Sequence, residues 1–200
     1  MKKIIMFAVL ALLAPMTYAE GNAAKGKDLA GTCLACHGEV GNSPAPSFPN
    51  LAGQHAGYLL KQLIEIQNGK REVLTMTGIL DNLSESDLSD LAAYYAGQPR
   101  NQGAAKEGLV ELGEAIYRAG IPRKDIAACT ACHSPTGNGN GPAVFPALAG
   151  QWPEYIVAQL KNFQTGVRHN DGDSKMMRTT AMDMNEKEMT AVASYLYGLK

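Results

Sequence analysis

The pattern of apolar and polar positions begins with a short leader. Lys2 and Lys3 precede an unbroken apolar run over residues 4–14, and the small side chain of Ala19 follows shortly afterwards. A charged start, an apolar centre and a small-residue end are typical of a secretory signal. The apolar run is well short of the ~20 residues that a membrane-spanning helix needs. We therefore expect cleavage after Ala19, which removes residues 1–19 and exports the remainder of the chain.

Two amphipathic helices are predicted at equivalent places further along the chain. Ser84 is followed three residues later by Asp87, and Asn185 is followed in the same way by Glu188. Each pair is a capping-box pattern that starts a helix. Apolar side chains then recur with the i, i+3, i+4, i+7 spacing of one helix face, namely Leu88, Leu91, Ala92 and Tyr95, and again Met189, Val192, Ala193 and Leu196. With no long β-like stretch in the chain, the prediction is an all-α fold.

The chain contains an internal duplication. Residues 48–54, Phe-Pro-Asn-Leu-Ala-Gly-Gln, match residues 145–151, Phe-Pro-Ala-Leu-Ala-Gly-Gln. The match continues at the constant offset of 97, pairing Tyr58, Gln62, Leu63, Gly69 and Arg71 with Tyr155, Gln159, Leu160, Gly166 and Arg168. Two copies of such a long repeat indicate tandem domains rather than a solenoid. The polar segment 98–103 contains Pro and Gly and is the predicted linker between domains 20–97 and 104–200.

The cysteines supply the candidate chemistry. All four cysteines and two of the four histidines lie in two Cys-x-x-Cys-His motifs, residues 33–37 and 129–133. This motif is the attachment signature of c-type haem. Residues three and four apart share one face of a helical turn, so two thiols can bond the haem vinyl groups while the imidazole reaches iron. The predicted attachment residues are Cys33, Cys36, Cys129 and Cys132, and the predicted proximal iron ligands are His37 and His133.

The motif has two other interpretations. A Cys-x-x-Cys pair is also found in redox disulfides and as half of a zinc site. Two complete copies with the histidine in place, behind an export signal, favour two covalent haem c groups. Each half is small and has few aromatic residues, so its core is limited without a buried macrocycle. We therefore expect the haem-free chain to be largely unfolded.

The sixth iron ligand separates an electron carrier from a catalyst. Met76 is the one methionine of the first copy after the leader, in a loop-like stretch ahead of the last helix. Aligning the two last helices places Met177 at the equivalent position, with Met176 as the second choice. His55 and His169 are weaker candidates because neither has a counterpart in the other copy. The remaining methionines of the second copy are interpreted as core residues or residues near the start of the last helix: Met182, Met184 and Met189.

Histidine and methionine on opposite faces leave iron no vacant position, and the thioether raises its potential. The prediction is therefore an electron carrier and not an enzyme. Without Lys2 and Lys3, 16 basic residues stand against 19 acidic ones, which excludes a nucleic-acid binder. A di-haem peroxidase would need one open iron position, so equivalent methionines in both halves argue against it. A haem-bearing electron-transfer subunit of a dehydrogenase complex is the remaining alternative.

These motifs together resemble the di-haem cytochromes c4 of bacterial periplasms. The resemblance covers residues 20–200, and residues 41–49 and 170–173 are also similar to that family. It implies two small helical domains that face each other, each around one covalently attached haem. It also implies that the carbonyls of Pro49 and Pro146 accept a hydrogen bond from the proximal imidazoles. Such proteins pass electrons from the cytochrome bc1 complex or a similar donor to a terminal oxidase, often in loose association with the membrane.

Overall fold

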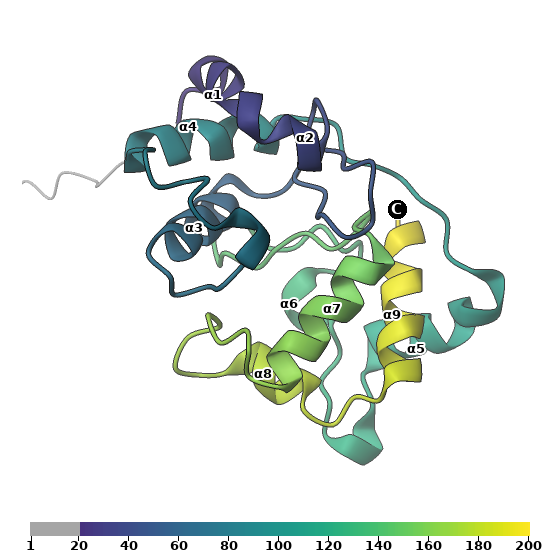
Figure 1. The fold of residues 1–200 in the computed structure, drawn as a ribbon. Helices are drawn as coiled ribbons and strands as arrows, with labels where there is room; N and C mark the ends of the chain where they lie inside the picture. The colour runs from purple at the N-terminus through teal and green to yellow at the C-terminus, as the bar shows by residue number, and fades with distance from the viewer. Residues whose placement is uncertain (1–20) are drawn as a thin grey trace, which may run out of the picture.

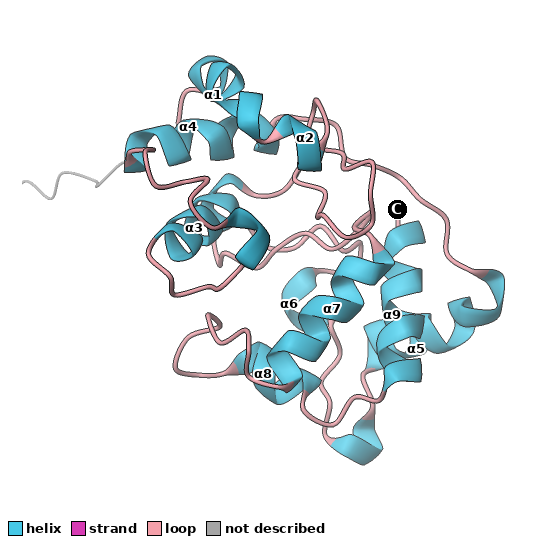
Figure 2. Ribbon diagram, viewed as in Figure 1, coloured by secondary structure: helices cyan, strands magenta, loops and turns pink. Residues whose placement is uncertain are grey.

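The computed structural model describes residues 21–200, and the predicted signal and its cleavage after Ala19 lie outside these described residues. Within residues 21–200 the chain is helical and forms isolated β-bridges but no strand, as Figure 2 shows. The predicted all-α fold is confirmed. No helix of the described part has the length and apolar character needed to cross a bilayer.

The elements follow the duplication, with one set of helices in each half (Figure 1). The first half contains α1 (Ala23–Leu29), η1 (Ala30–Thr32), α2 (Leu34–His37), α3 (Ala56–Gln67), η2 (Leu74–Met76) and α4 (Glu85–Ala96). The second half contains η3 (Glu107–Leu109), α5 (Val110–Ala119), η4 (Pro122–Lys124), α6 (Thr130–His133), α7 (Pro153–Gln164), α8 (Met176–Ala181) and α9 (Glu186–Gly198).

Capping boxes start the last helix of each half, as the sequence predicts. The Ser84 side chain accepts a hydrogen bond from the Asp87 amide, and the Asp87 carboxylate accepts one from the Ser84 amide. Asn185 and Glu188 make the same two bonds at the start of α9. The predicted apolar faces are buried, including Leu88 and Met189, which are 0% and 1% exposed. Each last helix thereby forms the centre of one hydrophobic core.

In each half the first helix crosses the last one at a glycine. Gly26 brings α1 against α4, and a Cβ at this position would collide with the carbonyl oxygen of Asp90. Gly113 brings α5 against α9, where a Cβ would collide with the carbonyl oxygen of Ala191. Only glycine permits so close an approach of two backbones. This crossing fixes the start of the haem motif, because Cys33 and Cys129 pack against the two cores.

The two halves differ mainly where the second copy is longer. Residues 121–125 form a small excursion closed by a bridge between Ile121 and Ile126 and containing η4. Helix α8 is a second difference, because the first half has only η2 in the segment before its last helix. The sequence predicts no helix in the methionine-rich segment that contains α8. The predicted linker is held against both halves: Asn42 bonds Pro99 and Asn101, and Arg100 bonds Gly53 and Asn138. The domain limits 20–97 and 104–200 stay a prediction.

Candidate haem sites

Each Cys-x-x-Cys-His motif forms a single helical turn. Cys33 is the N-cap residue of α2. This helix contains Cys36 and His37 and ends at the C-cap residue Gly38. The second motif forms α6 with the same arrangement. All four thiols are free and half-buried, so the disulfide interpretation is not supported. Among residues 21–200, no three side chains of His, Cys, Asp or Glu gather into a group that could hold a metal ion.

The two motif histidines are buried and held in one orientation. His37 is 8% exposed, and its Nδ1 lies 3.0 Å from the carbonyl oxygen of Pro49. His133 is 7% exposed, and its Nδ1 lies 2.9 Å from the carbonyl oxygen of Pro146. A carbonyl can only accept, so Nδ1 carries the hydrogen and Nε2 keeps a free lone pair. Burial lowers the pKa of both imidazoles, and the bond to the proline carbonyl offsets only part of this effect.

The burial of the thiols has a chemical consequence. Burial raises the pKa of the Cys129 thiol to about 11, and burial also raises the pKa of Cys33. Thiols with raised pKa values are poor nucleophiles in disulfide exchange. Cys33 and Cys129 therefore do not have the environment of a reactive redox thiol.

One continuous cavity of about 870 Å³ lies between the halves and is lined by both motifs. Its volume is at the upper end of the range for small-molecule and cofactor sites. The predicted haem residues that line it are Cys33, Cys36, His37, Pro49, Met76, Cys129, Cys132, His133, Pro146, Met176 and Met177. His55 and His169 do not line the cavity: His55 Nε2 lies 2.7 Å from the Asn138 carbonyl oxygen, and His169 contacts Val167.

The methionines divide by burial. Met76 is half-buried in η2 and packs against the first core, and Met177 is half-buried in α8 and packs against the second core. Met176, the second choice, is 45% exposed. Met184 and Met189 are buried in the core, as predicted. Met182 lies at the end of α8 and is 59% exposed, so it is not a core residue.

The walls of the cavity suit a flat, largely apolar cofactor. Phe48 lies 6.3 Å from the His37 ring and Phe145 lies 6.4 Å from the His133 ring, measured between ring centroids. Tyr95 also lines the cavity, and among the described residues its Oη is the buried side-chain polar atom that lacks a hydrogen-bond partner. A buried donor without a partner is costly, which indicates that the site is completed by a further group. The residues present therefore fit haem c.

Two buried arginines form the polar wall where the halves meet. Arg71 Nη2 donates to Tyr155 Oη (3.0 Å), and Arg168 Nη2 donates to Tyr58 Oη (3.0 Å). Each guanidinium also bonds the glutamines of its own half and of the facing half, Gln62 and Gln159. Both arginines are 8% exposed and line the cavity. Within the described residues, neither arginine forms an ion pair with a carboxylate.

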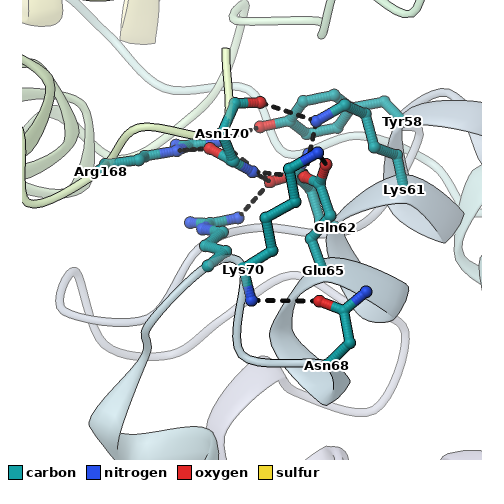
Figure 3. Close-up of polar contacts among 9 residues, drawn as sticks. Tyr58, Lys61, Gln62, Glu65, Asn68, Lys70, Arg168 and Asn170 are labelled. Carbon is teal, nitrogen blue, oxygen red and sulfur yellow. Dashed lines mark hydrogen bonds and ion pairs between the residues drawn. The ribbon is translucent and has the colours of Figure 1, made fainter. Parts of the chain in front are cut away.

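Figure 3 shows how the second half reaches α3 of the first. Asn170 Nδ2 donates to Gln62 Oε1 (2.9 Å) and to Glu65 Oε2 (2.6 Å), and Lys61 Nζ donates to the Asn170 carbonyl oxygen (2.8 Å). Burial alone would raise the pKa of Glu65, but the hydrogen bonds from Lys61 and Asn170 outweigh it and hold this pKa below its ordinary value. The repeat offset matches the arginines, tyrosines and glutamines between the two copies but predicts no role for them. The equal spacing of these residues in both copies was the sequence signal that could have marked them as functional.

The comparisons with known proteins agree with this geometry. The family model for cytochrome c matches residues 23–97 and again residues 110–200. Cytochrome c4 of Pseudomonas aeruginosa is 48% identical over 200 residues, covering 100% of both chains. The crystal structure of reduced recombinant cytochrome c4 from Pseudomonas stutzeri has a TM-score of 0.89 and 46% identity, covering 90% of this chain and 100% of that one. A protein of Stutzerimonas stutzeri named thiosulfate dehydrogenase electron acceptor is 37% identical, covering 82% of this chain and 76% of its own.

The two matched regions correspond to the two halves, each with its own Cys-x-x-Cys-His turn. Cytochromes c4 bind two covalent haem c groups, one per domain, and they are electron carriers and not enzymes. The chain belongs to the cytochrome c family, as a member of its di-haem cytochrome c4 group.

Proposed function

We propose that this protein is a periplasmic carrier that moves single electrons between respiratory proteins through two haems, each held by one histidine and one methionine. The observation that carries the proposal is the single cavity lined by both Cys-x-x-Cys-His turns and by one half-buried methionine from each half. When bound, haem iron supplies reversible one-electron oxidation and reduction. The protein supplies the attachment, the ligands and the exclusion of water.

The motif residues and the methionines have separate roles in this proposal. Cys33, Cys36, Cys129 and Cys132 hold the macrocycles covalently. His37 and His133 present Nε2 to iron, and the carbonyls of Pro49 and Pro146 orient the two rings. Met76 and Met177 complete the coordination. The half-buried position of Met177 against the second core supports it over the more exposed Met176.

The arginine wall has a role of its own. Arg71 and Arg168 are positive, buried and bonded to neutral tyrosine and glutamine side chains. A buried charge is stable only when it is paired or fully hydrogen-bonded. Haem carries two carboxylates, so each guanidinium offers one of them a charge-assisted hydrogen bond. The same residues then join the two halves and fix their haems relative to each other.

The partners are proposed as redox proteins. The cytochrome bc1 complex or a similar donor would supply the electrons, and a terminal oxidase would accept them. A second candidate source is a dehydrogenase, which is favoured by the relative named thiosulfate dehydrogenase electron acceptor. The proposal includes peripheral association with the membrane, cleavage after Ala19 and domain limits at 20–97 and 104–200. Size-exclusion chromatography of the native protein would separate a free carrier from a subunit of a larger complex.

A potentiometric titration of the purified protein tests the ligation, together with the weak far-red absorption band of ferric iron bound to methionine sulfur. The wild-type protein is expected to show two high-potential one-electron steps and the band on both haems. Met76→Ala and Met177→Ala should each abolish the band on one haem, lower its potential and open it to carbon monoxide. Met176→Ala is the matched control and should change neither haem.

The outcomes separate the alternatives. If Met176→Ala removes the band and Met177→Ala does not, the ligand of the second half is Met176. If one haem of the wild-type protein lacks the band and has a low potential, the carrier proposal fails. A peroxidase-type enzyme with an open iron position would then take its place.

A further inference from the structure

Two glutamines each reach across the interface and bind the backbone of the opposite half. Gln54 Nε2 donates to the Ala147 carbonyl oxygen (2.9 Å), and Gln54 Oε1 accepts from the Ala147 amide (2.8 Å). Gln151 Nε2 donates to the Asn50 carbonyl oxygen (2.9 Å), and Gln151 Oε1 accepts from the Asn50 amide (2.9 Å). The two glutamines are only 8% and 9% exposed. Each is therefore a two-point clamp on the other half in a site nearly free of solvent.

The clamped amides belong to the peptide groups that orient the proximal histidines. The Ala147 N–H lies in the same peptide group as the Pro146 carbonyl, which accepts from His133 Nδ1 at 2.9 Å. The Asn50 N–H lies in the same peptide group as the Pro49 carbonyl, which accepts from His37 Nδ1 at 3.0 Å. A continuous hydrogen-bonded chain thus runs from the histidine of each half, through one peptide group, to the glutamine of the other half.

The orientation of each glutamine amide is fixed by its neighbours. Gln54 Oε1 also accepts from the His55 amide (3.0 Å), and Gln151 Oε1 also accepts from the Trp152 amide (3.0 Å). Each oxygen therefore faces two N–H groups, whereas each nitrogen faces a carbonyl. Exchanging O and N would place donors against donors. The small space between the two clamps measures about 10 Å³, so it holds at most about one water.

Hydrogen bonds in a chain strengthen one another through the polarised group between them. An acceptor on the peptide N–H makes the carbonyl of that peptide a stronger acceptor. A stronger acceptor draws the Nδ1 hydrogen of the imidazole and increases electron density at Nε2, which raises ligand basicity. More electron density on an iron ligand favours the ferric state over the ferrous state.

We propose that Gln54 and Gln151 are positioning residues for the haem of the opposite half, each lowering the reduction potential of that haem through the proximal histidine. The inference rests on the proposed ligation by His37 and His133. The proposed effect crosses the interface. Gln54 lies in the first half and acts on the second haem, whereas Gln151 lies in the second half and acts on the first haem. A purely structural clamp would have no such direction.

The test replaces each clamp in the holoprotein by a side chain of similar size without hydrogen-bonding groups. Gln54→Met is expected to raise the midpoint potential of the second haem and leave the first unchanged, and Gln151→Met is expected to do the reverse. Cooperative strengthening of 10–30% in a charge-assisted bond predicts a change of about 1.3-fold to 4.6-fold in the ferric-to-ferrous ratio at fixed potential. For a one-electron couple this change equals roughly 7–40 mV.

Redox titration followed by NMR gives a separate midpoint for each haem, because haem resonances are assigned from their contacts with residues of one half. His55→Ala is the matched control. It removes a hydrogen bond between the halves, from the residue next to Gln54, without touching either clamped peptide. Its two midpoints should equal those of the wild-type protein.

The sign of the shift in midpoint potential distinguishes an effect of the glutamine on the haem from a loosening of the interface. Water entering a loosened site stabilises the charged ferric state and lowers the potential, opposite to the predicted rise. A fall, an equal shift of both haems, a shift in the half that carries the substitution, or no shift would overturn the inference. Because the two glutamines are independent tests, failure of one variant to fold leaves the other decisive. Failure of the proposed function is visible beforehand, because the wild-type protein would then lack the two high-potential steps and the methionine band.

Discussion

Replacing Gly113 by alanine should destabilise the second half, because this glycine lies where α5 crosses α9. The added Cβ would collide with the Ala191 carbonyl oxygen and would lie 2.6 Å from Tyr195 Cβ. Ordinary carbon contacts are about 3.5–4.0 Å long, so the helices would have to separate by roughly 1 Å. The colliding oxygen belongs to the backbone of α9 and cannot move aside as a flexible side chain could.

Two opposing effects set the magnitude. Overpacking at a close contact costs about 1–3 kcal/mol, whereas replacing glycine by alanine inside a helix gains up to about 1 kcal/mol. Because the colliding atom is a backbone oxygen, we take the upper part of the overpacking range, about 2–3 kcal/mol. After a gain of about 1 kcal/mol from the helix propensity of alanine, the expected net loss is about 1–2 kcal/mol. For a half of this size, that loss lowers the melting temperature by roughly 4–16 °C. Gly57 is the matched control, because it lies exposed in α3 with no atom within 4 Å of an added Cβ. Gly57→Ala should stabilise by about 0.4–1 kcal/mol.

Thermal unfolding of the holoprotein, followed by circular dichroism and by haem absorption, measures both effects. The two variants are expected to shift the melting temperature in opposite directions. A Gly113→Ala protein that melts at or above the wild-type temperature would refute the close helix crossing. Gly26→Ala repeats the test in the first half, where the same collision involves the Asp90 carbonyl oxygen.

Cys33→Ala should weaken or abolish covalent attachment in the first half only, and acidic extraction should then release one haem of the two; full retention of both would contradict the assignment. Arg168→Met removes four hydrogen bonds and leaves buried acceptors unpaired; chemical denaturation should show a loss of about 1–3 kcal/mol, and an unchanged midpoint would count against the network. Burial raises the pKa of Glu188, but hydrogen bonds from Lys124 and from the Asn185 amide outweigh burial and hold this pKa below the ordinary 4.5. The stability that ionised Glu188 contributes is therefore present above pH 4.5 and is lost as the pH falls through the lower folded value. The stability difference between wild type and Glu188→Gln should shrink in acid, and a constant difference would contradict this assignment.

The sequence predicted those helices whose start and buried face depend on nearby residues. The capping boxes at Ser84 and Asn185 and the periodic apolar faces that follow them define the starts and buried sides of α4 and α9. The two haem motifs fix their own geometry, because their spacing matches one helical turn. The contacts to Pro49 and Pro146 came from the family resemblance, and the structure contains both.

The contacts between the halves could not be predicted in the same way. The repeat offset shows that Arg71 corresponds to Arg168, but not that each arginine bonds the tyrosine of the opposite half. Asn170 lies in a segment that the sequence marks only by its similarity to the cytochrome c4 family, and its bond to Glu65 depends on how the halves pack. Helix α8 has no cap signal, since its first turn follows Lys175 in a left-handed conformation. Such features depend on tertiary packing, which overrides local propensity.

The glutamine contacts between the halves are arranged as in a dimer with two-fold symmetry. Gln54 meets residue 147, and its counterpart Gln151 meets residue 50, so this contact occurs again in reverse. An isologous interface of this kind normally joins two identical subunits about a C2 axis, and here it lies within one polypeptide. Perfect two-fold symmetry would give both irons the same surroundings and no preferred direction of flow. Residues that break the symmetry, such as Asn170, are therefore the places where the surroundings of the two haem sites differ.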